Sequence, residues 1–210
     1  MDDRGDRSSH VTKIGLWIVI DLVLIDMDGV LADFALHALA KFDRLDVYDN
    51  WPSGKYEIDE IIGIPQDELW AELDKEGPEF WSGLPELPWA TELCDLVRKK
   101  VGNFHISTSP SRAPASSMGK VHWLQQFFDP RFRRYMLGTH KYLMAKPSVV
   151  LIDDSDEKCK KFIEAGGHAI LFPQPWNSNY DQLDDRQPHG ARLAFVEKQL
   201  DAGHRMRGLS

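Results

Sequence analysis

The chain has 210 residues, with 25 Lys and Arg against 33 Asp and Glu, which gives a formal net charge of −8 at pH 7. Hydrophobic residues make up 42% and aromatic residues 10% of the sequence, enough to bury the core of one domain with an insertion, so intrinsic disorder is excluded. The acidic balance, without a stretch rich in Lys or Arg, argues against a protein that binds long nucleic acid.

The N-terminal region lacks the pattern of a membrane anchor or a secretory signal. The apolar run over residues 14–25 is interrupted by Asp21 and is too short to cross a bilayer, and the preceding acidic residues do not fit a signal peptide. We therefore expect a cytoplasmic protein with no membrane partner, in which residues 1–13 form a flexible tail. Cys94 and Cys159 are too few for a disulfide framework and lack the spacing of zinc ligands.

Short apolar runs alternate with helical patterns along the chain, which is typical of a parallel sheet whose strands are connected by helices. We expect strands at Leu22–Ile25, Asn103–Ser107, Arg134–Leu137, Val149–Ile152 and Ala169–Phe172. We expect helices at Leu31–Leu45, Pro65–Glu76, Thr91–Lys100, Gly119–Phe128, Asp156–Ala165 and Ala191–Leu200. The pattern predicts the α/β class with a parallel five-stranded sheet.

An insertion follows the first strand, because about 75 residues separate the first two strands where a crossover connection needs about 30. The inserted segment contains aromatic residues, several prolines and two of the helical patterns. We predict that residues 34–88 form a small helical cap above the sheet. Residues 14–33 and 89–210 would then form the α/β core.

Paired carboxylates follow the first predicted strand in Asp26-Met27-Asp28-Gly29-Val30. Carboxylates two residues apart at the end of an extended strand point to the same side, so Asp26 and Asp28 can face one ligand at the edge of the sheet. Gly29 allows the chain to turn away sharply. An ordinary acidic turn is the alternative explanation for this segment alone.

A second pair of carboxylates, Asp153 and Asp154, follows the apolar run that ends at Ile152. If the two acidic strand ends are neighbours, several carboxylates converge, and such close like charges do not all stay ionised without a cation. A site made of oxygen ligands suits Mg²⁺. The two pairs together therefore predict a magnesium site.

Two further segments could bind phosphate. Hydroxyl and backbone N–H groups of Ser107-Thr108-Ser109-Pro110 lie at another strand end, although an ordinary Ser/Pro turn explains that segment equally well. Lys141 follows the third predicted strand and could neutralise phosphate charge, and Lys146 is its rival. The loop at 173–177 is left open between a lid over this edge and a structural turn, and the charged residues at 157–161 predict a solvated helix face.

Four segments, residues 26–34, 107–110 and 151–154 together with Lys141, resemble the four motifs of the haloacid dehalogenase (HAD) superfamily. More narrowly, they resemble its 5′(3′)-deoxyribonucleotidases, including those of phages and bacteria. The likeness extends over residues 22–180. It implies a Rossmann-like core in which the strands before Asp26 and Asp153 are adjacent, with a small helical cap inserted after the first strand.

The resemblance also implies roles for these residues. Asp26 would be the nucleophile that forms an aspartyl-phosphate, and Asp28 would protonate the leaving oxygen and then activate water. Mg²⁺ would be held by the Asp26 carboxylate, the Asp28 backbone carbonyl and Asp153. Asp154 would contact the ligands of the ion and not the ion itself. The phosphoryl oxygens would be held by Thr108, Ser109 and Lys141.

The aromatic candidates for stacking on a nucleotide base are Phe34, Phe80 and Trp81, with Trp51 and Trp70 as weaker ones. The alternative is that these rings form the core of the cap itself. Two positions depart from the nucleotidase pattern: Thr139-His140 stands where a charged Arg-Asp pair is frequent, and Trp89 stands where glycine is usual. Both departures leave the substrate open.

The function expected from these features is a Mg²⁺-dependent phosphatase acting on deoxyribonucleoside monophosphates. One alternative is a phosphatase for another small phosphate ester, such as a sugar phosphate. The other is a catalytically silent nucleotide-binding module, which the presence of both Asp26 and Asp28 disfavours. A homodimer is compatible with the sequence, which does not fix the oligomeric state.

Overall fold

A five-stranded parallel sheet organises the part of the chain that the computed structural model describes, residues 19–183 and 188–205. Its strands are β1 (Leu22–Ile25), β2 (Phe104–Thr108), β3 (Tyr135–Leu137), β4 (Val149–Asp153) and β5 (His168–Leu171), in the order β3-β2-β1-β4-β5. All four strand pairs are parallel, so the carboxyl ends of β2, β1 and β4 lie side by side at one edge. The predicted α/β class and five-stranded sheet are confirmed.

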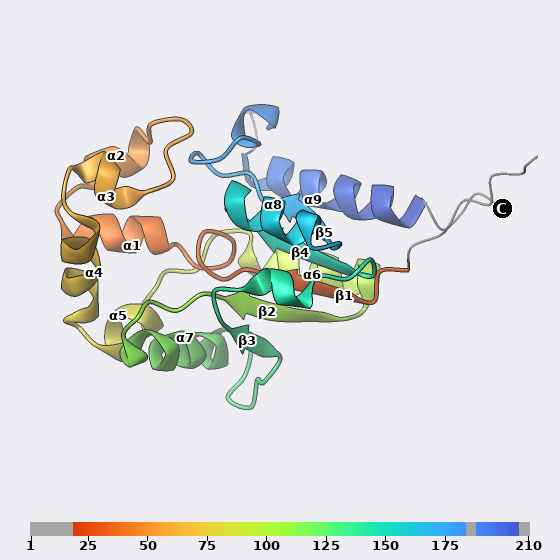
Figure 1. The fold of residues 1–210 in the computed structure, drawn as a ribbon, viewed down its shortest axis with the longest axis horizontal. Helices are drawn as coiled ribbons and strands as arrows, with labels where there is room; N and C mark the ends of the chain where they lie inside the picture. The colour runs from red at the N-terminus through yellow and green to blue at the C-terminus, as the bar shows by residue number, and fades with distance from the viewer. Residues whose placement is uncertain (1–18, 184–187, 206–210) are drawn as a thin grey trace, which may run out of the picture.

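Five helices lie between β1 and the long helix α6 (Ala90–Val101). They are α1 (Phe34–Lys41), α2 (Leu45–Asp49), α3 (Ile58–Ile62), α4 (Gln66–Asp74) and α5 (Pro78–Ser82). Figure 1 shows them gathered together at the end of the sheet toward which the strands point. The division into a core and a cap with boundaries at residues 34 and 88 stays a prediction, and the predicted tail at 1–13 lies outside the described residues.

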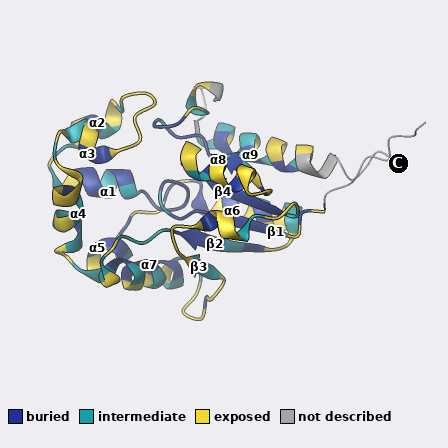
Figure 2. Cartoon of the chain, in the orientation of Figure 1, coloured by how far each residue is buried: buried dark blue, intermediate teal, exposed yellow. Residues whose placement is uncertain are grey.

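The remaining helices follow β2, β3, β4 and β5 along the chain. They are α7 (Pro114–Phe127), α8 (Asp156–Glu164) and α9 (Pro188–Arg205), together with the short 3-10 helices η1 (Lys141–Met144) and η2 (Tyr180–Gln182). Successive strand side chains point to opposite faces, so Val23 and Ile25 join the large core with α6, α7 and α9, while Leu24 packs with Phe162 of α8. Figure 2 shows that the central strands β1, β2 and β4 are largely buried.

Several predicted bounds differ from the structure for local reasons. The helix expected over Leu31–Leu45 is too long, because the Asp33 side chain accepts a hydrogen bond from the Leu36 N–H at 3.0 Å and caps a helix that begins at Phe34. That helix ends at Lys41, and α2 starts separately. The helix expected from Gly119 begins earlier, at Pro114, because proline fits the first turn of a helix.

Two further expectations concern the membrane and the cysteines. Among residues 19–183 and 188–205, no helix has both the length and the apolar character needed to cross a membrane. Cys94 and Cys159 are both buried and free.

Candidate active site

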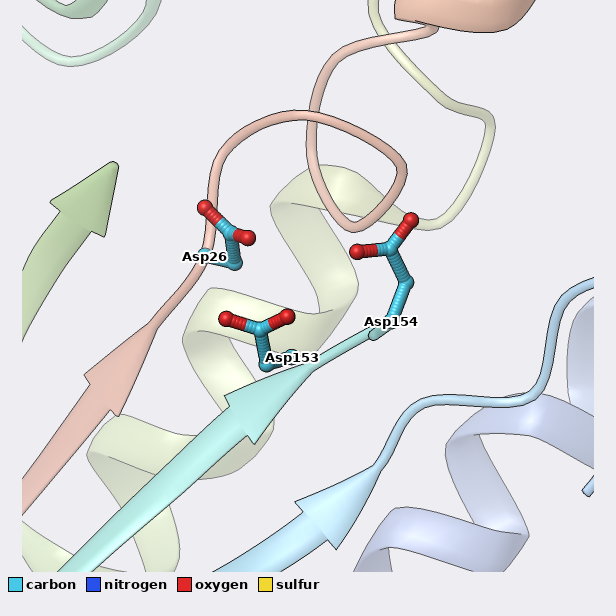
Figure 3. Close-up of side chains that lie close together, drawn as sticks. All are labelled: Asp26, Asp153 and Asp154. Atoms are coloured by element: carbon cyan, nitrogen blue, oxygen red, sulfur yellow. The ribbon is translucent and has the colours of Figure 1, made fainter. Parts of the chain in front are cut away.

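Three of the four acidic residues predicted from the two strand ends meet at the carboxyl edge of the sheet. Ile25 of β1 pairs with Ile152 of β4, and the Asp26 N–H donates to the Ile152 carbonyl at 2.8 Å. Asp26, Asp153 and Asp154, here called the acidic cluster, each place one carboxylate oxygen within 4.8 Å of the others. Figure 3 shows the three side chains turned toward one another from the ends of β1 and β4.

A buried lysine joins two members of the acidic cluster. The Nζ atom of Lys141, the first residue of η1, lies 2.7 Å from Asp26 Oδ2 and 2.6 Å from Asp153 Oδ2. The rival candidate, Lys146, is exposed to solvent. The structure therefore places Lys141, and not Lys146, beside the acidic residues.

The prediction that the charged residues of α8 form a solvated face is wrong for Lys158. Lys158 lies in the first turn of this helix, and its Nζ is 3.6 Å from Asp26 Oδ2. The turn between β4 and α8 is short, with the Ser155 side chain accepting a hydrogen bond from the Lys158 N–H, so this turn of the helix stays close to the acidic strand end. Sequence reasoning missed Lys158 because it treated the whole charged run as surface.

When all three carboxyl groups of the acidic cluster are ionised, they outnumber the two ammonium groups of Lys141 and Lys158. Burial acts to raise the pKa of Asp26, but Lys141 and Lys158 outweigh burial and lower that pKa to about 2. Burial and then the neighbouring carboxylates raise the pKa of Asp153, and they raise the pKa of Asp154 well above its usual value. Buried oxygen ligands with unbalanced negative charge fit a hard divalent cation.

The loop after β5 supports Asp154. Trp176 Nε1 donates to Asp154 Oδ2 at 2.8 Å, and Asn177 Nδ2 donates to the Asp154 carbonyl at 2.9 Å. The Trp176 ring also contacts the Trp51 ring, with the ring centroids 4.9 Å apart. These contacts support the interpretation of residues 173–177 as a structural turn, which holds Asp154.

Gly29 gives a direct test of how tightly this region is built. Its φ is +72°, and a Cβ added there would lie 2.1 Å from Asp154 Oδ2. We expect Gly29→Ala to lower the free energy of unfolding by about 1–2 kcal/mol through the left-handed backbone alone, and to displace the Asp154 carboxylate. Urea unfolding measures the first effect. Gly54→Ala, which has the same φ and nothing within 4 Å of the added Cβ, is the matched control, and equal effects of both variants would contradict the crowding at Asp154.

The side chain of Asp28 lies outside the acidic cluster. Its Oδ2 forms a short ion pair with Nζ of Lys120, which lies on α7. Sequence reasoning missed Lys120, although its place three and four residues before the buried Trp123 and Leu124 puts it on the apolar face of the helix. A lysine on such a face requires a partner, and that signal was available.

The predicted phosphate-binding residues lie at the end of β2, beside β1. Thr108 is fully buried, and its Oγ1 accepts a hydrogen bond from Lys120 Nζ at 3.2 Å. Ser109 is half-buried and donates through Oγ to the Gly138 carbonyl at 3.3 Å. Thr108 therefore lies next to the groups around Asp28, whereas the Ser109 hydroxyl contacts the segment that follows β3.

The aromatic candidates separate into two groups. Phe34, Trp70 and Trp81 lie near one another, with centroid distances from Phe34 of 6.0 Å to Trp70 and 5.7 Å to Trp81. Phe80 and Trp81 are each 1% exposed and belong to the core, whereas Phe34 and Trp70 are half-buried. Trp51 packs on the loop after β5 instead.

The two departures from the nucleotidase pattern lie in different surroundings. Trp89 is buried and donates through Nε1 to the Val30 carbonyl at 3.0 Å, so it fixes the turn that follows Asp28. Thr139 and His140 are exposed, and Thr139 Oγ1 lies 3.2 Å from His140 Nδ1.

Solved structures share this fold at low sequence identity. A HAD family hydrolase from Deinococcus radiodurans R1, determined with bound phosphate and sodium, is 16% identical with a TM-score of 0.52, over 89% of this chain and 97% of that one. A haloacid dehalogenase-like family hydrolase from Xanthomonas campestris is 15% identical with a TM-score of 0.52, over 89% of this chain and 98% of that one. No curated protein sequence matches the chain.

The fold and the acidic strand ends define a hydrolase of the HAD superfamily, of the phosphatase class. Residues 19–187 match the model of the family described as 5′ nucleotidase, deoxy (pyrimidine), cytosolic type C protein. The chain belongs to this family.

Proposed function

We propose that the protein is a Mg²⁺-dependent 5′(3′)-deoxyribonucleotidase that hydrolyses nucleoside monophosphates through an aspartyl-phosphate on Asp26. The observation that carries the proposal is the meeting of the acidic cluster with Lys141 at one edge of the sheet. The nucleotide substrate class is supported by the family to which the chain belongs.

The surroundings of Asp26 suit a nucleophile. Its lowered pKa keeps the carboxylate ionised at neutral pH, and its Oδ1 accepts the Met27 N–H at 2.7 Å. A carboxylate oxygen forms a bond to phosphorus while the ester P–O bond breaks and Asp28 gives a proton to the leaving oxygen. Water then attacks the aspartyl-phosphate and gives a proton to Asp28, which releases phosphate and restores both residues.

The positive groups at the site neutralise the phosphoryl oxygens. Lys141 and Lys158 already lie against Asp26, while Thr108 ends the adjacent strand β2 and Ser109 follows it. Positioning and charge neutralisation supply most of the catalysis in phosphoryl transfer.

The acidic cluster fits Mg²⁺ because its donor atoms are buried carboxylate oxygens. Burial and mutual repulsion disfavour their ionised forms, and a bound cation would offset both effects. Asp26 and Asp153 would hold the ion together with the Asp28 backbone carbonyl, and Asp154 lies beside them. Bound Mg²⁺ supplies neutralisation of the charge on the transferring phosphoryl group.

Within the group of rings around Phe34, the half-buried Phe34 and Trp70 have surface left for a nucleotide base. Phe80 and Trp81 would support Phe34 from the buried side, since both rings contact it. Stacking of a base on an aromatic face is tolerant of base identity, so these residues favour nucleotides as a class.

A phosphate-release screen over nucleoside monophosphates and sugar phosphates tests the proposal. We expect the highest activity on deoxyribonucleoside monophosphates, a loss of at least about 10²-fold on adding EDTA, and recovery with Mg²⁺, because the ion supplies several kcal/mol of charge stabilisation. A preference for a sugar phosphate over every nucleotide would reject the nucleotidase. Nucleotide binding without phosphate release from any ester would instead identify a silent binding module.

A further inference from the structure

Lys120 is a fully buried lysine that the proposed steps do not use. Its side chain is 0% exposed, and its Nζ contacts Asp28 Oδ2, the hydroxyl of Thr108 at 3.2 Å and the ring of Trp81, whose centroid lies 5.0 Å away. A buried ammonium group is strongly unfavourable unless it is paired. The carboxylate of Asp28 is its ionic partner among the described residues.

The position of Lys120 is fixed by close packing between α7 and α5. At the preceding residue, Gly119, an added Cβ would lie 2.3 Å from the Pro78 carbonyl oxygen and 2.5 Å from the Trp81 Cβ. Three residues after Lys120, Trp123 donates through Nε1 to the Leu84 carbonyl at 2.8 Å. The backbone that carries Lys120 therefore has little freedom to move.

The two carboxylate oxygens of Asp28 have different surroundings. Oδ2 is held by Lys120, whereas the buried Oδ1 has no hydrogen-bond partner within the part of the chain that the structure describes. A buried oxygen without a partner is unfavourable unless a ligand or water completes it. The unpartnered oxygen is therefore the one available to a reacting group.

We propose that Lys120 is a positioning residue that holds Asp28 so that Oδ1 exchanges the proton with the substrate. The inference rests on the proposed function, and it deepens the part played by Asp28. Lys120 keeps its own protons throughout. The proton moves from Asp28 Oδ1 to the leaving oxygen as the ester P–O bond breaks, and a proton from the attacking water returns to Asp28 as the aspartyl-phosphate is hydrolysed.

Two esters with different leaving groups test this role. Deoxythymidine 5′-monophosphate releases an alkoxide-type oxygen that needs a proton, whereas p-nitrophenyl phosphate releases a phenolate that does not. Because kcat/KM reports the steps up to leaving-group departure, we expect Lys120→Met to lower kcat/KM about 10²-fold for the nucleotide and by less than about threefold for the aryl ester. Lys120→Arg, which keeps the positive charge, is expected to recover part of the loss on the nucleotide.

A double-mutant cycle shows whether Lys120 acts through Asp28. We expect the Asp28→Asn/Lys120→Met variant to be no slower on the nucleotide than Asp28→Asn alone. This double variant also removes both buried charges together, so it keeps the test open if Lys120→Met alone does not fold. Lys160→Met, at an exposed position on α8, is the control for loss of one lysine and should match the wild type on both esters.

Two results would overturn the positioning role: an equal loss on both esters in Lys120→Met, or a further loss in the double variant beyond that of Asp28→Asn. Wild-type protein that hydrolyses neither ester would reject the proposed function instead. In that case, urea unfolding of the wild type, Lys120→Met, Asp28→Asn and the double variant tests whether Lys120 and Asp28 are paired. Changes in unfolding midpoint that simply add would overturn the pairing, and a double variant less affected than the sum would support it.

Discussion

Replacing Asp26 by Asn is expected to lower phosphate release by about 10⁴-fold or more while the fold stays intact, because an amide oxygen does not replace the carboxylate as a nucleophile. The structure indicates why the effect should be so large. Asp26 is the residue that both Lys141 and Lys158 approach, and it stands at the end of the central strand β1. Phosphate release at saturating Mg²⁺ and nucleotide measures the loss.

Asp21→Asn is the matched control for this variant. Asp21 immediately precedes the other end of the same strand and is exposed to solvent, so the same chemical change there should leave turnover unaltered. Circular dichroism and urea unfolding establish that Asp26→Asn is folded. Turnover near the wild-type rate in a folded Asp26→Asn protein would show that no aspartyl-phosphate forms on this residue.

Replacing Lys141 by Met is expected to affect both stability and activity. The Lys141 side chain is 2% exposed and touches two carboxylates, so its removal leaves buried negative charges without their partner. The free energy of unfolding should fall by about 3–5 kcal/mol, as is usual when one member of a buried ion pair is removed. Turnover should fall as well, since a positive charge beside the transferring phosphoryl group is lost.

Lys146→Met provides the comparison, because Lys146 is exposed and follows η1 closely in the sequence. Urea unfolding in the presence of EDTA measures both variants without a contribution from bound cations. Similar stability of the two variants would mean that the contacts of Lys141 with Asp26 and Asp153 do not stabilise the fold.

Much of the architecture was predictable because it depends on local patterns. Apolar runs alternating with helical segments indicated the parallel sheet, and the wide spacing after β1 indicated an insertion there. The carboxyl ends of adjacent parallel strands share an edge, so Asp26 and Asp153 were expected to converge if their strands were neighbours, and the resemblance to the HAD superfamily implied that they are. Lys141 was predictable for a similar reason, because it lies just after β3.

The parts that were missed depend on tertiary contacts. Helices α2, α3 and α5 have five residues each, which is too short for a periodic pattern to be visible. The position of Lys120 on an apolar helix face was visible in the sequence, but the partners of Lys120 and Lys158 depend on how their helices pack. For Lys158, the short turn after β4 decided the outcome, and for Lys120 the close contact at Gly119 did.

The strand order also determines when the protein becomes able to work during its synthesis. β1 pairs with β2 on one side and with β4 on the other, and β4 leaves the ribosome after the first three strands and long after β1 itself. Until then the apolar β1 presents an unpaired backbone edge, which is open to pairing with other chains. Because Asp153 arrives with β4, a nascent chain that ends before Val149 cannot assemble the site, and we expect both folding and activity to depend on this late, long-range pairing.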